Sequence, residues 1–384
     1  MPNHQKFLER LWEAFPGQVY LAGKYADTNL GLPEDNVLRV FLPDFHWISI
    51  KNLERYPKGY GFNGNLQIPS NGKPIFGTLL DVLEDIHDYD IPSKTAGLEV
   101  YQLGDAYDLW REMAPEDKDA TNAYRRIRKD PALEKIIERL DGLSIKHTLG
   151  NHDQWINKLD KAVLDDMPMT QAKTSWSAAG DRIIMTHGHE YDTLEMGLPD
   201  KIQAEAVRIW TSLRVGKHSI GVFSKKTKNN ILMVLGLRNK GLRKDFYPTV
   251  EADGAYIIEK DEDLATCEKN YDTFLDVSGF SRAPGSSNDF AHIDYLRYAD
   301  EIAAAELNHP LDHSVHVIGH THQARMLLDR IAPNRPFVTL DCGGWIGLCK
   351  VLIKGKREAA YVPSAQIGVQ SGNDLRLYQL GGVG

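Results

Sequence analysis

The chain has 384 residues, of which 42% are hydrophobic and 26% are charged, with a formal net charge of −8 at pH 7. Its three cysteines have no spacing typical of a zinc ribbon or a disulfide framework, and no apolar run approaches the roughly 20 residues of a membrane span. Residues 1–18 predict a short amphipathic helix and lack the apolar core of a signal peptide. We therefore expect a soluble, cytoplasmic protein.

Further along the chain, five short apolar runs each end in a turn that carries Asp, Asn or His. This pattern is typical of strands in a layered α/β protein, with functional residues on the loops that follow the strands. The runs are residues 37–46, 98–108, 145–153, 182–192 and 314–322. Between them, residues 78–90, 116–142 and 289–310 predict helices, the second broken near Pro131. Residues 336–380 predict strands joined by glycine turns, which could complete a second sheet.

The expected organisation is an N-terminal extension over residues 1–36, followed by one main domain over residues 37–384. Residues 195–309 are too many for a simple loop and predict a partly helical insertion or cap. Within it, residues 201–244 contain eleven Lys or Arg and a single acidic residue, Glu205. This basic segment predicts a lid that attracts an anionic substrate, a nucleic acid or an anionic membrane surface. A solvated helical face is the alternative.

The first two strand ends carry closely spaced acidic residues. Asp44 and His46 lie two residues apart, so in an extended segment their side chains point the same way and both could reach one metal ion. Asp105 and Asp108 follow Gly104 in a GDxxD sequence. Two carboxylates so close are costly to bury unless they face a cation or hydrogen-bond donors.

The later strand ends carry Asn and His. Asn151 and His152 form part of GNHD, where Asn supplies a neutral oxygen ligand and the His can serve as a proton donor. His187 and His189 stand two apart in THGHEYD, as do His320 and His322 in GHTH. Because strand ends gather at one edge of an α/β sheet, these oxygen and imidazole groups together predict a metal site.

The order DxH, GDxxD, GNH(D/E), His and GHxH resembles the calcineurin-like metallophosphoesterase family. The resemblance spans residues 44–322 and implies an α/β fold, a four-layer αββα sandwich of two mixed sheets with a helical insertion or cap. It also implies a two-metal site in which Asp105 bridges the ions. By the same resemblance, Asp44, His46 and His322 hold the first ion, and Asn151, His187 and His320 hold the second.

Such a site implies hydrolysis of a phosphomonoester, phosphodiester or pyrophosphate bond by a hydroxide held between two divalent transition-metal ions. Mixed nitrogen and oxygen ligation suits manganese, iron, zinc or cobalt better than calcium and does not choose among the four. Of these we expect manganese first, with iron, zinc or cobalt as alternatives. His152 is the candidate for protonating the leaving oxygen, and Asp108 is the candidate for orienting His152. The family takes the histidine directly after the strand as the ligand, which is His187 here. His189 remains a candidate for contacting the substrate.

Three further stretches, GDAYDLW (104–110), THGHEYD (186–192) and DCGGWIG (341–347), resemble the UDP-2,3-diacylglucosamine pyrophosphatase-like branch of that family. Two alternatives to a small-molecule phosphoesterase stay open. One is a metal-dependent nuclease, because the basic segment has the charge to neutralise a phosphate backbone and has aromatic residues in or beside it. The other is a non-catalytic scaffold with the same fold, although no ligand of the motif set is missing.

Overall fold

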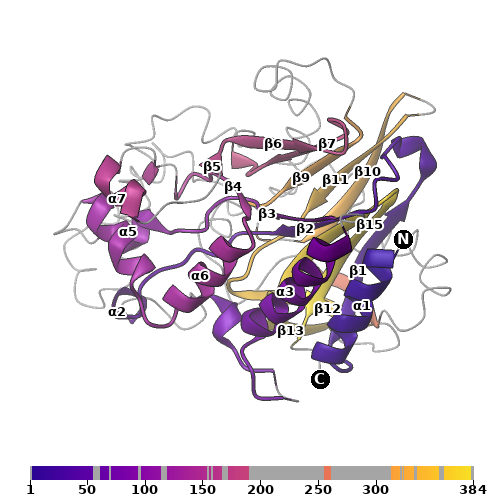
Figure 1. Ribbon diagram of the computed structural model, residues 1–384. Coiled ribbons are helices and arrows are strands. Elements are labelled where there is room, and N and C mark those ends of the chain that lie inside the picture. The colour runs from indigo at the N-terminus through magenta and orange to yellow at the C-terminus, as the bar shows by residue number, and fades with distance from the viewer. Residues whose placement is uncertain are drawn as a thin grey trace, which may run out of the picture.

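Figure 1 shows the protein as a computed structural model. The structure describes residues 2–54, 61–68, 71–93, 97–113, 119–153, 155–156, 159–166, 172–189, 255–260, 313–320, 322, 324–332, 335–353 and 359–381. None of the helices in these ranges combines the length and the apolar character that crossing a membrane requires. The predicted helix at residues 289–310, most of the predicted cap and the whole basic segment 201–244 lie outside the described residues.

The described strands form two mixed sheets. In spatial order, the larger, ten-stranded sheet consists of β13 (Ala359–Pro363), β12 (Leu348–Ile353), β8 (Ala255–Lys260), β1 (Val19–Ala26), β15 (Asp374–Leu380), β14 (Gln366–Ser371), β2 (Val37–Leu42), β3 (Gly97–Gln102), β4 (Lys146–Thr148) and β5 (Ala172–Lys173). Strands β2, β3, β4 and β5 run parallel, whereas β14, β15 and β1 pair antiparallel. Parallel neighbours bring their carboxyl ends, and the loops that follow, to one edge of the sheet.

The second, five-stranded sheet has the order β10 (Arg325–Ala332), β11 (Arg335–Asp341), β9 (Val315–Ile318), β7 (Ile183–Thr186) and β6 (Ser175–Ala178). Its central strands β11, β9 and β7 are parallel, and its outer strands β10 and β6 are antiparallel to their neighbours. The chain passes from the larger sheet to the smaller one between β5 and β6, across the single residue Thr174. The strand ends of both sheets can therefore contribute to one site.

Helices cover the face of the ten-stranded sheet that points away from the smaller sheet. The described helices are α1 (Pro2–Ala14), α2 (Ile50–Leu53), α3 (Ile75–Ser93), α4 (Leu109–Glu112), α5 (Ala120–Arg128), α6 (Glu134–Gly142) and α7 (Lys161–Asp166), with short 3-10 turns at Thr28–Leu30 and Asn63–Asn65. Figure 1 shows α1, α3 and α6 lying together in front of the sheet. In α3, the buried side chains of Phe76, Leu79, Leu80 and Leu83 recur every three or four residues, so one stripe of the helix faces the core.

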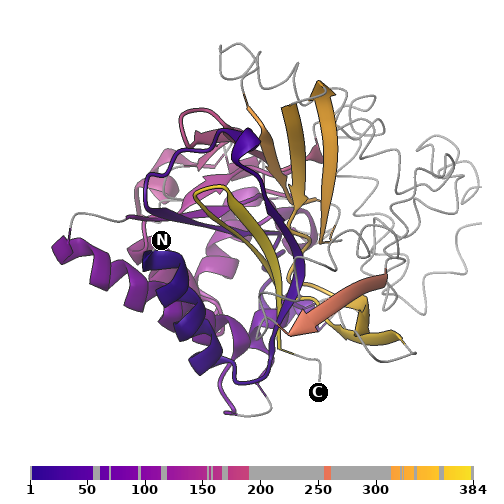
Figure 2. The same ribbon diagram turned by 90° about the vertical axis from the view of Figure 1, so that its right-hand side faces the viewer.

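Two apolar cores separate these layers. The outer core packs α1, α3, α5 and α6 against the ten-stranded sheet, with Phe7, Leu83 and Val40 among its buried members. The inner core packs the two sheets face to face and includes Leu377 of β15 and Leu340 of β11. Figure 2 shows the helical layer and the two sheets from the side. The predicted α/β fold with two mixed sheets is confirmed, and a helical layer over the outer face of the five-stranded sheet would have to come from residues outside the described ranges.

The first 36 residues do more than precede the main domain. They supply α1 and β1, and β1 lies inside the ten-stranded sheet, paired with β15 over Val19–Ala26 and with β8 at Tyr20 and Leu21. Strand β8 belongs to the predicted insertion, yet it pairs with β1 and β12 of the same sheet. Both regions therefore contribute strands to the larger sheet.

Two other predictions differ from the structure in extent or in sheet membership. The helix expected over residues 116–142 is two helices, α5 and α6, separated at Pro131. Helix α5 begins after Asp119, whose side chain accepts hydrogen bonds from the backbone N–H groups of Thr121 and Asn122. The C-terminal strands are divided between the sheets, because β11 joins the smaller sheet and β12 to β15 join the larger one.

Candidate metal centre

The candidate metal centre lies where five strands end. Strands β2, β3 and β4 end there from the larger sheet, and β7 and β9 end there from the smaller one. Backbone hydrogen bonds tie the loops together: His46 N donates to Asp105 O at 2.8 Å, and Gly319 N donates to His187 O at 3.0 Å. The loops bring together nine residues singled out from the sequence: Asp44, His46, Asp105, Asp108, Asn151, His152, His187, His320 and His322.

One group of donor atoms consists of Asp44, His46 and His322. The Nε2 atoms of His46 and His322 are 3.0 Å apart. Oδ2 of Asp44 lies 3.1 Å from His322 Nε2 and 3.9 Å from His46 Nε2. Only one proton can lie between two ring nitrogens in contact, so at least one imidazole directs a lone pair into this group. Two nitrogens and a carboxylate oxygen that converge in this way are a group that could hold a metal ion.

A second group of donor atoms surrounds His187. Its Nε2 is 3.1 Å from Asn151 Oδ1 and 3.3 Å from Asp105 Oδ2. The ring of His320 meets the ring of His187 edge to face, with the centroids 5.0 Å apart. The backbone N–H of His320 donates to both carboxylate oxygens of Asp44, at 3.1 and 3.0 Å, and so connects this group to the first.

Asp105 stands between the two groups. Its Oδ2 is 3.5 Å from His46 Nε2 in the first group and 3.3 Å from His187 Nε2 in the second. Its Oδ1 accepts a hydrogen bond of 2.8 Å from the backbone N–H of His152. Burial would raise the pKa of this carboxyl, but the neighbouring His187 and His152 outweigh burial and hold the pKa well below its usual value. The group is therefore an ionised carboxylate that faces both donor sets.

Hydrogen bonds behind the histidines fix which ring nitrogen faces the centre. His46 Nδ1 donates to Asp108 Oδ2 at 2.9 Å, and His187 Nδ1 donates to the carbonyl oxygen of Leu103 at 2.8 Å. Each ring is left with Nε2 directed inwards. This arrangement is typical of metal-binding histidines, whose outer nitrogen is held by a carboxylate or a carbonyl. Burial also lowers the pKa of His46 to about 4, which favours the neutral imidazole that binds cations.

Asp108 supports two histidines at once. Besides His46, it accepts a hydrogen bond from His152 Nδ1 at 2.8 Å through Oδ1. Arg111 completes the set, with its backbone N at 3.0 Å from Oδ1 and its Nε at 2.9 Å from Oδ2. Burial favours the neutral acid, yet the charges of Arg111 and His152 prevail and hold the pKa of Asp108 well below its usual value. In turn, the carboxylates of Asp108 and Asp105 outweigh burial and raise the pKa of His152.

The backbone around the centre takes conformations that few side chains tolerate. His46, Asp105, His320 and His322 all have positive φ, between 48° and 66°. Residues other than glycine avoid this region, and such outliers occur most often at functional sites. Glycine is required at close approaches: a Cβ at Gly150 would overlap Oδ1 of Asp105, and one at Gly319 would overlap Oδ1 of Asp44. These glycines let the loops approach the carboxylates.

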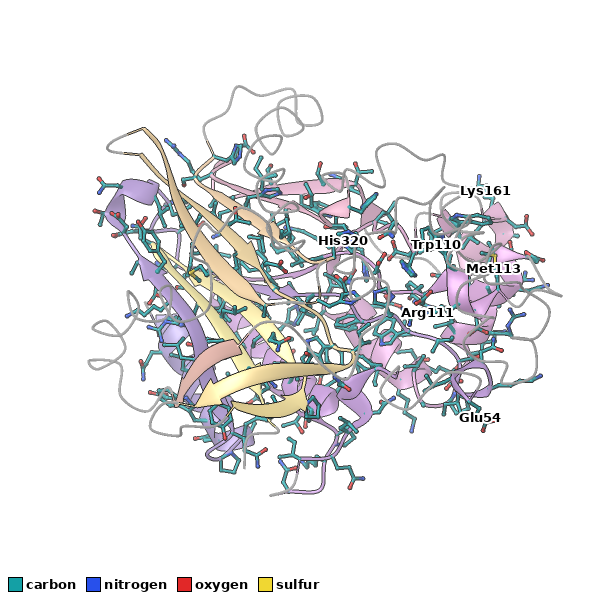
Figure 3. All side chains as sticks on the ribbon, turned by 180° about the vertical axis from the view of Figure 1, so that it is seen from behind. Glu54, Trp110, Arg111, Met113, Lys161 and His320 are labelled. Atoms are coloured by element: carbon teal, nitrogen blue, oxygen red, sulfur yellow. The ribbon has the colours of Figure 1, made fainter. Side chains whose placement is uncertain are left out.

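Some features of the centre were not predicted from the sequence. Asp153, the last residue of GNHD, accepts hydrogen bonds from Ala106 N and Gly150 N and ties two loops together. Trp110 and Arg111, labelled in Figure 3, come from α4 and contact His152 and Asp108. The sequence could have indicated both residues as neighbours of Asp108. Asp108 caps the N-terminus of α4, so the first residues of that helix lie beside it. His189 lies further out, with its ring centroid 5.3 Å from that of His187.

Comparisons with known proteins add little to this geometry. No protein-family model matches the chain, and no curated protein matches it. Among similar solved structures is a dimetal phosphatase from Danio rerio. It is 13% identical, covers 90% of this chain and 99% of its own, and superposes with a TM-score of 0.31. A likeness at this level carries no information about chemistry.

Proposed function

We propose that this chain is a dinuclear metal-dependent phosphoesterase of the calcineurin-like kind. The observation that carries the proposal is the position of Asp105, whose Oδ2 lies 3.5 Å from the Nε2 of His46 and 3.3 Å from that of His187. A carboxylate between two sets of inward-facing imidazoles is what a pair of cations requires. Within each of three overlapping Asp and His triads the donor atoms lie within 4.8 Å of one another, which is close enough for them to hold a metal ion.

The two ions would be held by different sets of residues. Asp44, His46 and His322 would hold the first, Asn151, His187 and His320 would hold the second, and Asp105 would contact both. When bound, two divalent cations supply a nucleophile from water at neutral pH and neutralise charge on a phosphoryl group. Manganese is the first choice for this mixture of nitrogen and oxygen donors, with iron, zinc and cobalt as alternatives.

The remaining chemistry falls to His152. Its Nδ1 is engaged by Asp108, which leaves Nε2 as the ring nitrogen that can reach a substrate. Burial lowers the pKa of His152, but the carboxylates of Asp108 and Asp105 outweigh burial and raise it above its usual value, which favours the protonated ring that can donate to the departing oxygen. Asp108 orients the ring through Nδ1. The substrate is a phosphomonoester, a phosphodiester or a pyrophosphate.

The test is hydrolysis of p-nitrophenyl phosphate and bis-p-nitrophenyl phosphate, with Mn²⁺ added and with a chelator. We expect activity that needs the metal, and about two ions per chain. In the variant His152→Ala we expect both ions to remain. Turnover of phenyl phosphate, whose leaving oxygen needs a proton, should fall by about 10²–10⁴-fold, the usual contribution of a general acid, and turnover of p-nitrophenyl phosphate should fall less. His87→Ala, on the surface of α3, is the matched control and should behave like the parent.

Two outcomes would count against the proposal. Protein that binds two ions but hydrolyses no phosphoester in a broad panel would favour a non-catalytic scaffold. A His152→Ala protein that loses an ion would make His152 a ligand, which its proximity to His46 and Asp105 would also allow. A nuclease would show itself in the same panel by cleaving single-stranded DNA or RNA with strong salt dependence. Neutralising Lys225, Lys226 and Lys228 of the basic segment should then raise KM for the nucleic acid alone.

A further inference from the structure

Helix α4 is a single turn, Leu109–Glu112, in which every residue is buried. It begins at Asp108, whose side chain accepts a hydrogen bond of 3.0 Å from the backbone N–H of Arg111. Such a short helix contributes little to the fold by itself, since isolated turns are unstable in water. Its side chains nevertheless occupy the space directly behind His152.

Trp110 contacts His152 face to face. The two rings are nearly parallel, with their centroids 4.4 Å apart and an interplanar angle of 28°. The ring of His46 approaches His152 edge to face, with the centroids 4.6 Å apart. Asp108 holds Nδ1 of His152 at 2.8 Å. The imidazole is therefore fixed on one face by Trp110, along another side by His46 and at one nitrogen by Asp108.

A hydrogen bond at Nδ1 alone leaves the ring free to tilt about the N–H···O direction, because that contact is a single point. Stacking against a large, rigid ring removes this freedom, and offset stacking is a favoured geometry for aromatic pairs. Trp110 is itself buried, with 1% of its surface exposed. Arg111, the next residue of the same turn, holds Asp108 through Nε at 2.9 Å. One helical turn thus fixes both the face of His152 and the carboxylate that orients it.

We propose that Trp110 is a positioning residue for His152 and keeps Nε2 of the imidazole directed at the leaving oxygen of the substrate. The inference rests on the proposed function, since it assigns Trp110 a role in the same reaction. Trp47, another buried tryptophan near the centre, serves as a comparison. Trp47 is equally buried, follows His46 in the chain and packs against the rings of Phe45, Phe62 and Tyr107.

The experiment is a double-mutant cycle with the full-length, metal-loaded protein. Trp110→Leu should lower kcat by about 10–100-fold, the usual effect of losing an outer partner, with two ions still bound and KM little changed. In a His152→Ala background, the same substitution should cost less than about twofold, because the group it positions is gone. Trp110→Phe, which keeps a ring against the imidazole, should recover most of the loss.

Leaving groups provide the second readout. The loss in Trp110→Leu should be larger for phenyl phosphate, whose leaving oxygen needs a proton, than for p-nitrophenyl phosphate, whose leaving oxygen does not. Trp47→Leu is the matched control: it removes an indole of equal burial, so any loss it causes should be the same for both substrates. If Trp110→Leu does not fold in a thermal-unfolding assay, the cycle is run with Trp110→Phe, for which a smaller loss with the same pattern is expected.

A loss in Trp110→Leu that persists undiminished in the His152→Ala background, or that is equal for both leaving groups, would overturn the inference and make Trp110 a packing residue. A wild-type protein that binds two ions and hydrolyses neither substrate would overturn the proposed function, and this inference with it. The two failures are distinguished by the activity of the wild-type protein.

Discussion

The two sheets contribute different chemistry to the centre. The ten-stranded sheet supplies all the carboxylates among the candidate residues, Asp44, Asp105 and Asp108, from the loops after β2 and β3. The five-stranded sheet supplies imidazoles alone, His187 after β7 and His320 and His322 after β9. The carboxylates therefore gather on one side of the interface between the sheets, and the other side contributes imidazole nitrogens. Neither sheet carries a complete donor set for either of the two proposed ions.

This division shows how the fold can bury three acidic groups together. Burying an ionised carboxylate is costly unless donors or a cation satisfy it. Some of the donors come from the opposite sheet, as when the backbone N–H of His320 donates to Asp44. The donor groups also differ in charge. In the first, Asp44 lies beside His322 and Asp108 stands behind His46, whereas in the second the neutral Asn151 accompanies His187. We therefore expect the first ion to bind more tightly than the second.

The largest effect should come from the residue shared by both donor groups. Asp105→Asn removes a charged oxygen that faces His46 and His187, so both ions should weaken. Loss of an outer partner usually costs 10–100-fold, and loss of a shared ligand should cost more than about 100-fold in activity. Metal analysis after dialysis measures how many ions remain bound, and hydrolysis of p-nitrophenyl phosphate measures the loss of activity. Asp374→Asn, which removes a carboxylate paired with Arg376 in β15, is the control. Retention of both ions in Asp105→Asn would refute the bridging position.

The next largest effect should come from the core between the sheets. Leu340 of β11 is fully buried in the inner core, and Leu83 of α3 is fully buried in the outer core. Truncation of either to Ala should lower the free energy of unfolding by about 2–5 kcal/mol. Only Leu340→Ala should also weaken Mn²⁺ binding, because it loosens the contact that brings the two donor sets together. Equal metal affinity in the two variants, measured by titration, would show that the centre does not depend on sheet packing.

A smaller and one-sided effect is expected at Asp108. The variant Asp108→Asn removes the charge behind His46 and leaves the Leu103 carbonyl behind His187 intact. The first ion should weaken by about 10–100-fold, and the second should be nearly unaffected. Isothermal titration with Mn²⁺ should resolve the two affinities. Equal weakening of both ions would contradict the separation of the donor groups.

A pH-dependent effect concerns one buried histidine in each sheet, outside the centre. Burial lowers the pKa of His147 in β4 and of His316 in β9 to about 3. An unfolded histidine has a pKa of about 6.5, so below that pH the unfolded chain binds more protons than the folded one. Stability should therefore be highest above pH 6.5 and fall as the pH drops towards 3, by up to about 1.4 kcal/mol per pH unit for each histidine.

Chemical unfolding between pH 7 and pH 4 measures this dependence. In His316→Gln, the free energy of unfolding should fall less steeply with decreasing pH, by the contribution of one histidine. The control His87→Gln, at the partly exposed surface of α3, should leave the pH dependence unchanged. A fall that is equally steep in His316→Gln and in the parent would show that this histidine is not buried in its neutral form.

Features set by residues close together in the chain could be predicted from the sequence. Features set by contacts between residues far apart in the chain could not. The strands before Asp44, Asp105 and His187 were predictable because a buried strand and its polar end lie within ten residues of each other. The position of β1 was not, because its partner β15 lies some 350 residues away in the chain and nothing local specifies that pairing. The contact of Trp110 with His152 was not predictable for a similar reason, since it joins α4 to the loop after β4, and the two residues are far apart in the chain.

The most direct measurement of the central claim is anomalous diffraction from crystals of the wild-type protein soaked in Mn²⁺. The account predicts two peaks in the interface between the sheets. One should contact Asp44, His46 and His322, the other should contact Asn151, His187 and His320, and Asp105 should contact both. A single peak, two peaks held by residues of one sheet, or a pair of ions without Asp105 between them would contradict it.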